Sequence, residues 1–301
     1  MDTYYIRHTD GLDINDATRQ RLWDDRRIAI HFPDDKNGEW CGHDSTSLDL
    51  ADYPARGRRA MRALTELAKN GGYVCAEYFQ HAECILGYVR PASRIELIRG
   101  TWGSRRGFDG REAILKSLKV EKATLVSPFD SAVFLVGRPQ QGTIARWRRA
   151  GMRIANIVEG KRATPSLELL SPDQQETMCA EFLRSEDTKR LRLPKLIHLL
   201  LPVGRTMRGI DICGISDSGS MVFAQVTFLS FEHCGKKLDA LLQFGDRDRN
   251  ALVLFCDCAE PKQKNGVKII PLRAVYDSFT ATPTGKLWIE RATNPVSSAR
   301  E

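Results

Sequence analysis

The residues of this chain with the clearest chemical potential lie in one short stretch, Gly209 to Phe228. Asp211 stands among apolar residues on one predicted strand, and Gln225-Val226-Thr227 stands on a second. A polar amide on an otherwise apolar strand costs free energy unless its hydrogen bonds are satisfied, which favours a role for Gln225 such as orienting a metal-bound water. A structural alternative stays open, because Asp211 could cap a turn or pair with an arginine, and Gln225 could lie on a sheet surface.

A hairpin is the element that must position these residues. Apolar and polar positions alternate on both sides of Asp217-Ser218-Gly219, which predicts two half-buried strands joined by a tight turn. Residues Ser171 to Arg184 are predicted to form a capped helix before the hairpin, and Cys234 to Phe244 a helix after it. Further strands are expected at Ala251 to Cys256 and at Val267 to Leu272. A tight hairpin would bring the acid of the first strand near the polar pair of the second.

This order of elements resembles the core of the PD-(D/E)xK nucleases, and within them the Mrr-like restriction endonucleases, over about residues 165 to 280. The resemblance implies a Mg²⁺ site and hydrolysis of phosphodiesters. Its ligands would be Asp211, the carboxylate of Glu176 or Glu181, and the backbone carbonyl of Val226. Gln225 would position the attacking water.

One position departs from the pattern of that family. Thr227 stands where the family carries a lysine, and a threonine cannot supply the positive charge that stabilises the developing charge on phosphate. Lys236 or Lys237, at the start of the next predicted helix, could reach the site from another direction. The sequence therefore leaves both an active nuclease and a pseudo-nuclease scaffold open.

Basic residues are concentrated in the middle of the chain, within a net charge of +7. Residues 1 to 52 carry six Lys/Arg against twelve Asp/Glu, whereas residues 53 to 150 carry eighteen against eight. The clusters are Arg56, Arg58, Arg59 and Arg62; Arg105 and Arg106; and Arg146, Arg148, Arg149 and Arg153. Such clusters predict contacts with the phosphates of duplex DNA, although arginines on an amphipathic helix can also simply solvate its outer face.

The N-terminal part mixes short strands with one clear helix, Ala55 to Lys69, which Asn70-Gly71-Gly72 ends. Strands are expected at Gly72 to Tyr78, Cys84 to Val89, Arg94 to Arg99, Ala123 to Val126 and Ala132 to Val136. Many short strands around few helices predict a small barrel or a strongly bent sheet.

The segment Gly71 to Leu97, a strand, a short excursion and a strand ending in a basic turn, resembles the PUA-like barrels and their EVE-type modules, which read modified bases. That resemblance implies a pocket for a flipped base with an aromatic wall. The aromatic candidates are Tyr78, Phe79, Tyr88 and Trp102. Each of them could equally be part of the core.

Several other chemistries are disfavoured by what the chain lacks. It contains no Walker-type loop, no G-x-G-x-x-G turn, no G-x-S-x-G elbow, no H-E-x-x-H helix and no paired C-x-x-C knuckles. It has no long apolar run, and its first residues lack the apolar core of a secretory signal. Its eight cysteines then indicate reduced thiols and a cytoplasmic location.

The sequence thus predicts an α/β (α+β) protein with two domains, a PUA/EVE-like nucleic-acid reader at residues 1 to 158 and a restriction-endonuclease-like domain at residues 165 to 295. The expected function is a Mrr-like, Mg²⁺-dependent and modification-dependent DNA endonuclease of prokaryotic defence, which could act as a homodimer. The alternatives are a non-catalytic DNA-binding protein and an RNA-binding accessory factor.

Overall fold

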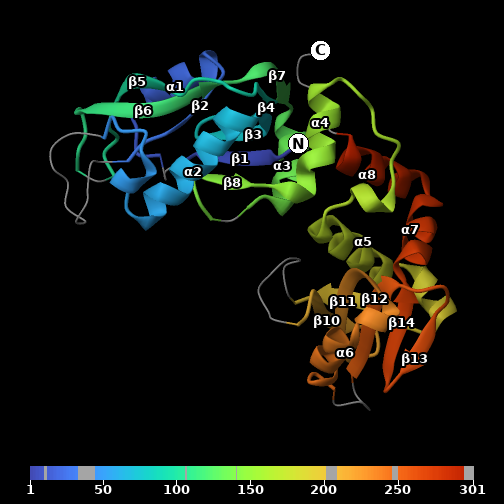
Figure 1. Cartoon of the computed structure of the whole chain (residues 1–301). Helices are drawn as coiled ribbons and strands as arrows, with labels where there is room; N and C mark the ends of the chain where they lie inside the picture. The colour runs from blue at the N-terminus through green and yellow to red at the C-terminus, as the bar shows by residue number, and fades with distance from the viewer. Residues whose placement is uncertain are drawn as a thin grey trace. The chain divides into compact units, whose positions relative to one another are not determined.

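The chain forms two compact units, and the computed structural model describes residues 1–9, 12–32, 45–105, 107–139, 141–200, 209–245 and 250–294. The first unit comprises residues 1–164 together with Asn294, and the second comprises Pro165–Thr293. Helices and strands are mixed in each unit (Figure 1), so the predicted α/β class is confirmed. Among the helices of the described ranges, none has both the length and the apolar character needed to cross a membrane.

The first unit is built on two sheets. A five-stranded sheet has the order β7-β4-β3-β1-β8, and a three-stranded sheet has the order β2-β6-β5. The strands are β1 (Thr3–His8), β2 (Arg27–Ile30), β3 (Gly72–Tyr78), β4 (Cys84–Val89), β5 (Glu96–Thr101), β6 (Glu112–Lys119), β7 (Glu121–Val126) and β8 (Ile144–Arg146). Strands β1 and β3 run parallel, with Thr3 opposite Tyr73, and the other pairs are antiparallel.

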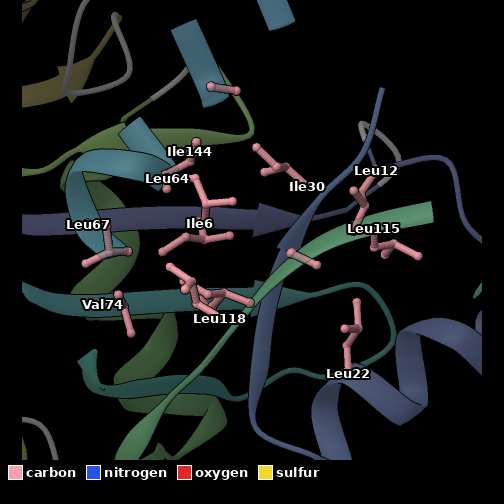
Figure 2. Packing of buried hydrophobic residues seen from close by; sticks show 14 of the residues in the cluster. Ile6, Leu12, Leu22, Ile30, Leu64, Leu67, Val74, Leu115, Leu118 and Ile144 are labelled. Atoms are coloured by element: carbon pink, nitrogen blue, oxygen red, sulfur yellow. The ribbon is translucent and has the colours of Figure 1, made fainter. Parts of the chain in front are cut away.

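Helices cover these sheets. They are α1 (Asp16–Asp24), α2 (Ala55–Asn70), α3 (Pro128–Phe134) and α4 (Gly151–Val158). The predicted helix at Ala55 is therefore confirmed as α2, and its apolar face joins the main core of the unit. Figure 2 shows Leu64 and Leu67 of α2 in one cluster with Ile6 of β1 and Leu118 of β6.

Two expectations for this unit were wrong. Within the described residues no closed barrel forms, because β7 and β8 end the five-stranded sheet without pairing with each other, and β2, β5 and β6 form a sheet of their own. The expected strand at Ala132–Val136 is instead the end of α3 and the turn that follows it. Ser127 caps this helix through the amide of Asp130, and Pro128 occupies its first turn, so local capping outweighs the strand preference of the apolar run.

The second unit is a single six-stranded sheet between helices. The strand order is β13-β14-β12-β11-β10-β9. The strands are β9 (Leu196–Leu199), β10 (Ile212–Ser216), β11 (Met221–Ser230), β12 (Asn250–Asp257), β13 (Lys262–Lys264) and β14 (Val267–Pro271). The helices are α5 (Pro172–Arg184), α6 (Gly235–Leu242), α7 (Leu272–Thr280) and α8 (Pro283–Thr293).

The two faces of this sheet are buried by different helices. Residues of α5, α7 and α8 pack with Val222, Ala224 and Phe255 on one face. Residues of α6 pack with Leu252 and Leu254 on the other face. The helix and strand positions predicted around the hairpin are confirmed, since α5 begins at a capping box formed by Ser171 and Gln174, and β10 and β11 pair across the predicted turn. The expected alternation is limited to Met221–Ala224, because Ala224, Gln225 and Val226 are all buried.

Candidate functional site

Asp211 lies at the point where the hairpin begins. Strands β10 and β11 are antiparallel with Ile212 opposite Ala224, and the amide of Asp211 donates to the carbonyl of Ala224 at 2.9 Å. The amide of Val226 donates to Oδ2 of Asp211 at 2.8 Å. The hairpin therefore brings the acid to the polar positions of the second strand, as the sequence predicted.

The carboxyl of Asp211 is held in a largely desolvated environment. Burial raises its pKa, while the hydrogen bond from Val226 and the positive charge of Lys237 act in the opposite direction, and the net pKa is raised. Lys237 is half-buried on α6, whereas Lys236 is exposed. Of the two candidate lysines, Lys237 is the one whose charge acts on the acid.

We expect Asp211→Asn to raise the free energy of unfolding at neutral pH. The folded-state pKa of Asp211 lies above its ordinary value of 3.8, so the folded protein binds this proton more tightly than the unfolded chain. The ionised carboxyl therefore lowers stability at high pH, and that effect fades as the pH falls through the raised pKa. Asparagine can still accept from Val226. The check is the melting temperature of both proteins from neutral to acidic pH; a gap that stays constant with pH, or a less stable variant, contradicts the expectation.

The helix α5 directs its two candidate acids differently. Glu176 is half-buried, and its charge and that of Asp211 both raise the pKa of the buried Cys179 thiol, after the larger effect of burial. Both carboxylates thus lie within electrostatic reach of the same thiol. Glu181 is exposed and forms an ion pair with Arg184 at 3.4 Å. The packing of α5 thus places Glu176, like Asp211, within reach of the Cys179 thiol, while Glu181 is exposed to solvent.

Gln225 is buried, with 2% of its surface exposed, and it serves the hairpin directly. Its Nε2 donates to the carbonyl of Gly209, two residues before Asp211. Gly209 has a φ of +93°, and a Cβ there would lie 3.2 Å from that of Ala240, so the chain can pass this close to α6 only as glycine. Oε1 of Gln225 is buried and has no hydrogen-bond partner within the described part of the protein.

Thr227 has a local structural task. It is half-buried, and its Oγ1 accepts a hydrogen bond from the amide of Leu229 at 3.2 Å. This contact closes a short turn where the pairing of β11 with β12 is interrupted after Val226. The hydroxyl supplies no charge to the site.

The donor set suits a hard cation that keeps water ligands. Mg²⁺ prefers oxygen ligands and is commonly bound through one or two carboxylates. The carboxylates of Asp211 and Glu176 are oxygens of this kind, whereas Gln225 lies, like Phe223, on the face of the sheet that α6 covers. Within the described ranges, no group of three or more His, Cys, Asp or Glu side chains is arranged to hold a metal. A metal here would therefore depend on amide or carbonyl oxygens and on water to complete its shell.

The basic clusters of the first unit differ in how far their side chains are exposed. Arg56, Arg58, Arg59 and Arg62 are all exposed on α2, and Arg105 and Arg148 are exposed as well. Arg106 and the side chain of Arg149 lie outside the described residues.

Arg146 and Arg153, both predicted to contact DNA, interact with other residues of the protein instead. Arg146 forms ion pairs with Glu66 at 2.9 Å and with Asp2 at 3.3 Å. Arg153 is 2% exposed and stacks over Phe134 at 4.7 Å, and burial lowers the pKa of its guanidinium to about 10. The expectation that Arg153 contacts DNA from the surface was wrong, because one apolar face of α4 carries it into the core.

The four aromatic candidates do not share one pocket. Trp102 and Tyr78 are buried in the core, where Trp102 packs edge-on to His31 and Tyr78 stacks on His8 at 4.3 Å. Tyr88 pairs with Tyr73 at 5.5 Å. Only Phe79 among the four is largely exposed, at 48%.

Phe79 borders a hollow of about 540 Å³ that the sequence did not reveal. Arg19 lies 5.5 Å from its ring, is itself buried, and donates to Asp16 at 2.7 Å. The other lining residues are Asp13, Ile14, Asn15, Gly103, Ser104, Arg105 and Asp109. An Asp-x-x-Arg spacing on a helix predicts only a surface ion pair, and nothing local signals that this arginine is buried beside a loop distant in sequence.

Comparison with known proteins adds little to this geometry. No family model matches the chain, and no curated protein matches it either. Among solved structures, the chain is similar to the MspJI restriction endonuclease in complex with a 27-mer oligonucleotide, at 11% identity and a TM-score of 0.25, over 89% of this chain and 74% of that one. A similarity of this strength does not establish a common fold.

Proposed function

We propose that this protein is a Mg²⁺-dependent DNA endonuclease of the Mrr-like kind, with its reactive site in the second unit. The observation that carries the proposal is that the charge of Lys237, on α6, acts on Asp211, while Asp211 and Glu176, on α5, both act on the thiol of Cys179. Two carboxylates with one ammonium group provide the charges that hydrolysis of a phosphodiester requires.

Each residue has a distinct role in this proposal. Asp211 and Glu176 would hold the metal, which supplies an acidified water and neutralises charge on the scissile phosphate. Lys237 would stabilise the negative charge that develops on phosphate, in place of the lysine missing at Thr227. Oε1 of Gln225, a buried acceptor without a protein partner in the described structure, would orient a water.

The direct test is incubation of the wild-type protein with duplex DNA in Mg²⁺ and in EDTA. Cleavage in Mg²⁺ alone supports the nuclease. DNA binding without cleavage would instead support the alternative, a non-catalytic DNA-binding protein. That alternative is favoured by the structural use of two motif positions, since Gln225 anchors Gly209 and Thr227 closes a turn.

The first unit would supply DNA contacts through the exposed arginines of α2. We expect charge reversal of Arg56, Arg59 and Arg62 to lower affinity for duplex DNA about tenfold or more at low salt, and to reduce the salt slope by roughly 0.9 for each phosphate that is no longer neutralised. Arg58 is left unchanged because its guanidinium donates to the carbonyls of Leu50 and Tyr53. The measurement is fluorescence anisotropy over a salt series.

The matched comparison is between the single reversals Arg59→Glu and Lys286→Glu, because both change the net charge by two and Lys286 is an exposed cation on α8. Lys286→Glu should leave the affinity and the salt slope close to those of wild type. Equal losses of affinity in both proteins would show that only net charge matters and that α2 is no specific contact surface.

In the same proposal, a modified base would be read at the Phe79 hollow.

A further inference from the structure

Strand β11 carries a bulge directly after the candidate site. Its pairing with β12 runs in register from Met221 opposite Asn250 to Val226 opposite Phe255, and resumes only at Ser230 opposite Asp257. Three residues of β11 lie between these two pairs but only one residue of β12, so β11 has two extra residues there. Bulges next to sites commonly redirect side chains out of the sheet.

The bulge is fixed by its own hydrogen bonds. The amide of Leu229 donates to Oγ1 of Thr227 at 3.2 Å. The thiol of the buried Cys234 contacts the carbonyl of Leu229 at 3.7 Å and that of Ser230 at 3.4 Å. The backbone is therefore held from both sides.

Two large apolar side chains are exposed on this fixed segment. Phe228 is 44% exposed and Leu229 is 47% exposed. Single exposed apolar residues are common on protein surfaces, but an adjacent pair held out by a bulge indicates a contact surface. The amide of Val226 donates to Asp211, and an extended strand rises about 3.3 Å per residue, so the backbone of Phe228 lies at most roughly 7 Å from that of Val226.

Positive charge lies at Phe231, two residues beyond the pair in sequence. Phe231 follows β11, and the ammonium of Lys262 lies 3.5 Å and that of Lys264 5.5 Å from the centre of its ring. Both lysines are exposed on the edge strand β13. Glu232 is also near Lys262, whose charge lowers the pKa of that carboxyl, and offsets part of the positive charge. An exposed apolar pair with cations at the end of the same short segment fits a nucleic acid, whose bases are apolar on their faces and whose backbone is anionic.

We propose that Phe228 and Leu229 form a wedge that stacks on a nucleobase of bound DNA beside the strand held at Asp211, with Lys262 and Lys264 on the adjoining phosphates. The inference rests on the proposed function, because it requires DNA at the Asp211 site. The wedge would fix the position of the scissile phosphate relative to the acids, since a base stacked on the fixed bulge cannot slide along the site.

The test uses the full chain with Asp211→Asn to prevent cleavage, and a pool of short duplex oligonucleotides as the probe. Phe228→Trp in that background should lose tryptophan fluorescence on addition of DNA, with the same midpoint as binding measured by anisotropy. Leu287→Trp is the control, because Leu287 is 59% exposed on α8, away from the bulge in sequence. Its fluorescence should stay unchanged. Phe228→Ala with Leu229→Ala should weaken binding about tenfold, as loss of one stacked base does.

The outcomes separate the wedge from the proposed function. Saturable DNA binding with unchanged fluorescence of the Phe228→Trp variant, or unchanged affinity of the double alanine variant, overturns the wedge and leaves the nuclease standing. Absence of any DNA binding by the parent protein overturns both. In a third outcome, the fluorescence of the Phe228→Trp variant depends on protein concentration in the absence of DNA. Phe228 and Leu229 would then be a self-association surface, which also overturns the wedge.

Discussion

Asp211→Asn should lower the rate of Mg²⁺-dependent DNA cleavage by about 10³-fold or more, while the protein stays folded. Loss of a metal-binding carboxylate removes several kcal/mol of stabilisation of the transition state, and each ~1.4 kcal/mol corresponds to a tenfold change in rate. The amide oxygen of asparagine can still accept the hydrogen bond that Val226 donates to Oδ2. Cleavage of labelled duplex DNA and thermal unfolding, measured on the same preparation, check the two parts of this expectation.

Two comparison variants sharpen that result. Asp211→Ala also removes cleavage, but it leaves the amide of Val226 without its acceptor and should cost about 1–3 kcal/mol of stability. Glu181→Gln is the matched control, because Glu181 is exposed and paired with Arg184, and it should retain activity where Glu176→Gln does not. If Asp211→Asn cuts DNA as wild type does, the acid is structural and the nuclease proposal fails.

Lys237→Ala should lower cleavage by about 10² to 10³-fold with little change in DNA binding. Removing a single group that stabilises developing charge in a transition state has an effect of this size. Lys237 is the lysine whose charge acts on Asp211. The check is the single-turnover cleavage rate at saturating protein, which separates the chemical step from binding.

The neighbouring residue provides the control for this variant. Lys236 is exposed and carries the same charge one position earlier on α6, so Lys236→Ala should cleave at close to the wild-type rate. Thr227→Lys restores the cation of the family pattern and should rescue Lys237→Ala in part. Equal activity of wild type and Lys237→Ala would show that the missing lysine has no substitute on α6.

Local sequence signals were sufficient to predict the hairpin, two helices and two further strands of the second unit, but not α7, α8, β9 or β13. Helices α5 and α6 and the hairpin between them lie where apolar periodicity, the Ser171 cap and the Asp217-Ser218-Gly219 turn predict them. Each of these signals depends on residues only a few positions apart. The contact between Asp211 and the second strand was also predictable from local sequence, because the tight turn of the hairpin determines which residues of β10 and β11 lie opposite each other.

Local signals misled where distant strands had to choose partners. The predicted barrel depends on which strands meet at the sheet edges, and β7 and β8 do not pair with each other. The segment Ala132–Val136, expected as a strand, is helical at its start because Ser127 and Pro128 begin a helix just before it.

The packing of the folded chain selected which of several equivalent residues face the candidate site. Glu176 and Glu181 lie on the same helix, and Lys236 and Lys237 are adjacent in sequence. Which glutamate and which lysine act near Asp211 depends on how α5 and α6 are rotated about their axes against the sheet. The same holds for Arg153, which sequence groups with exposed arginines and packing buries over Phe134. The physical reason is that helix rotation is set by the summed burial of side chains from strands far away in the chain, and no local pattern contains that sum.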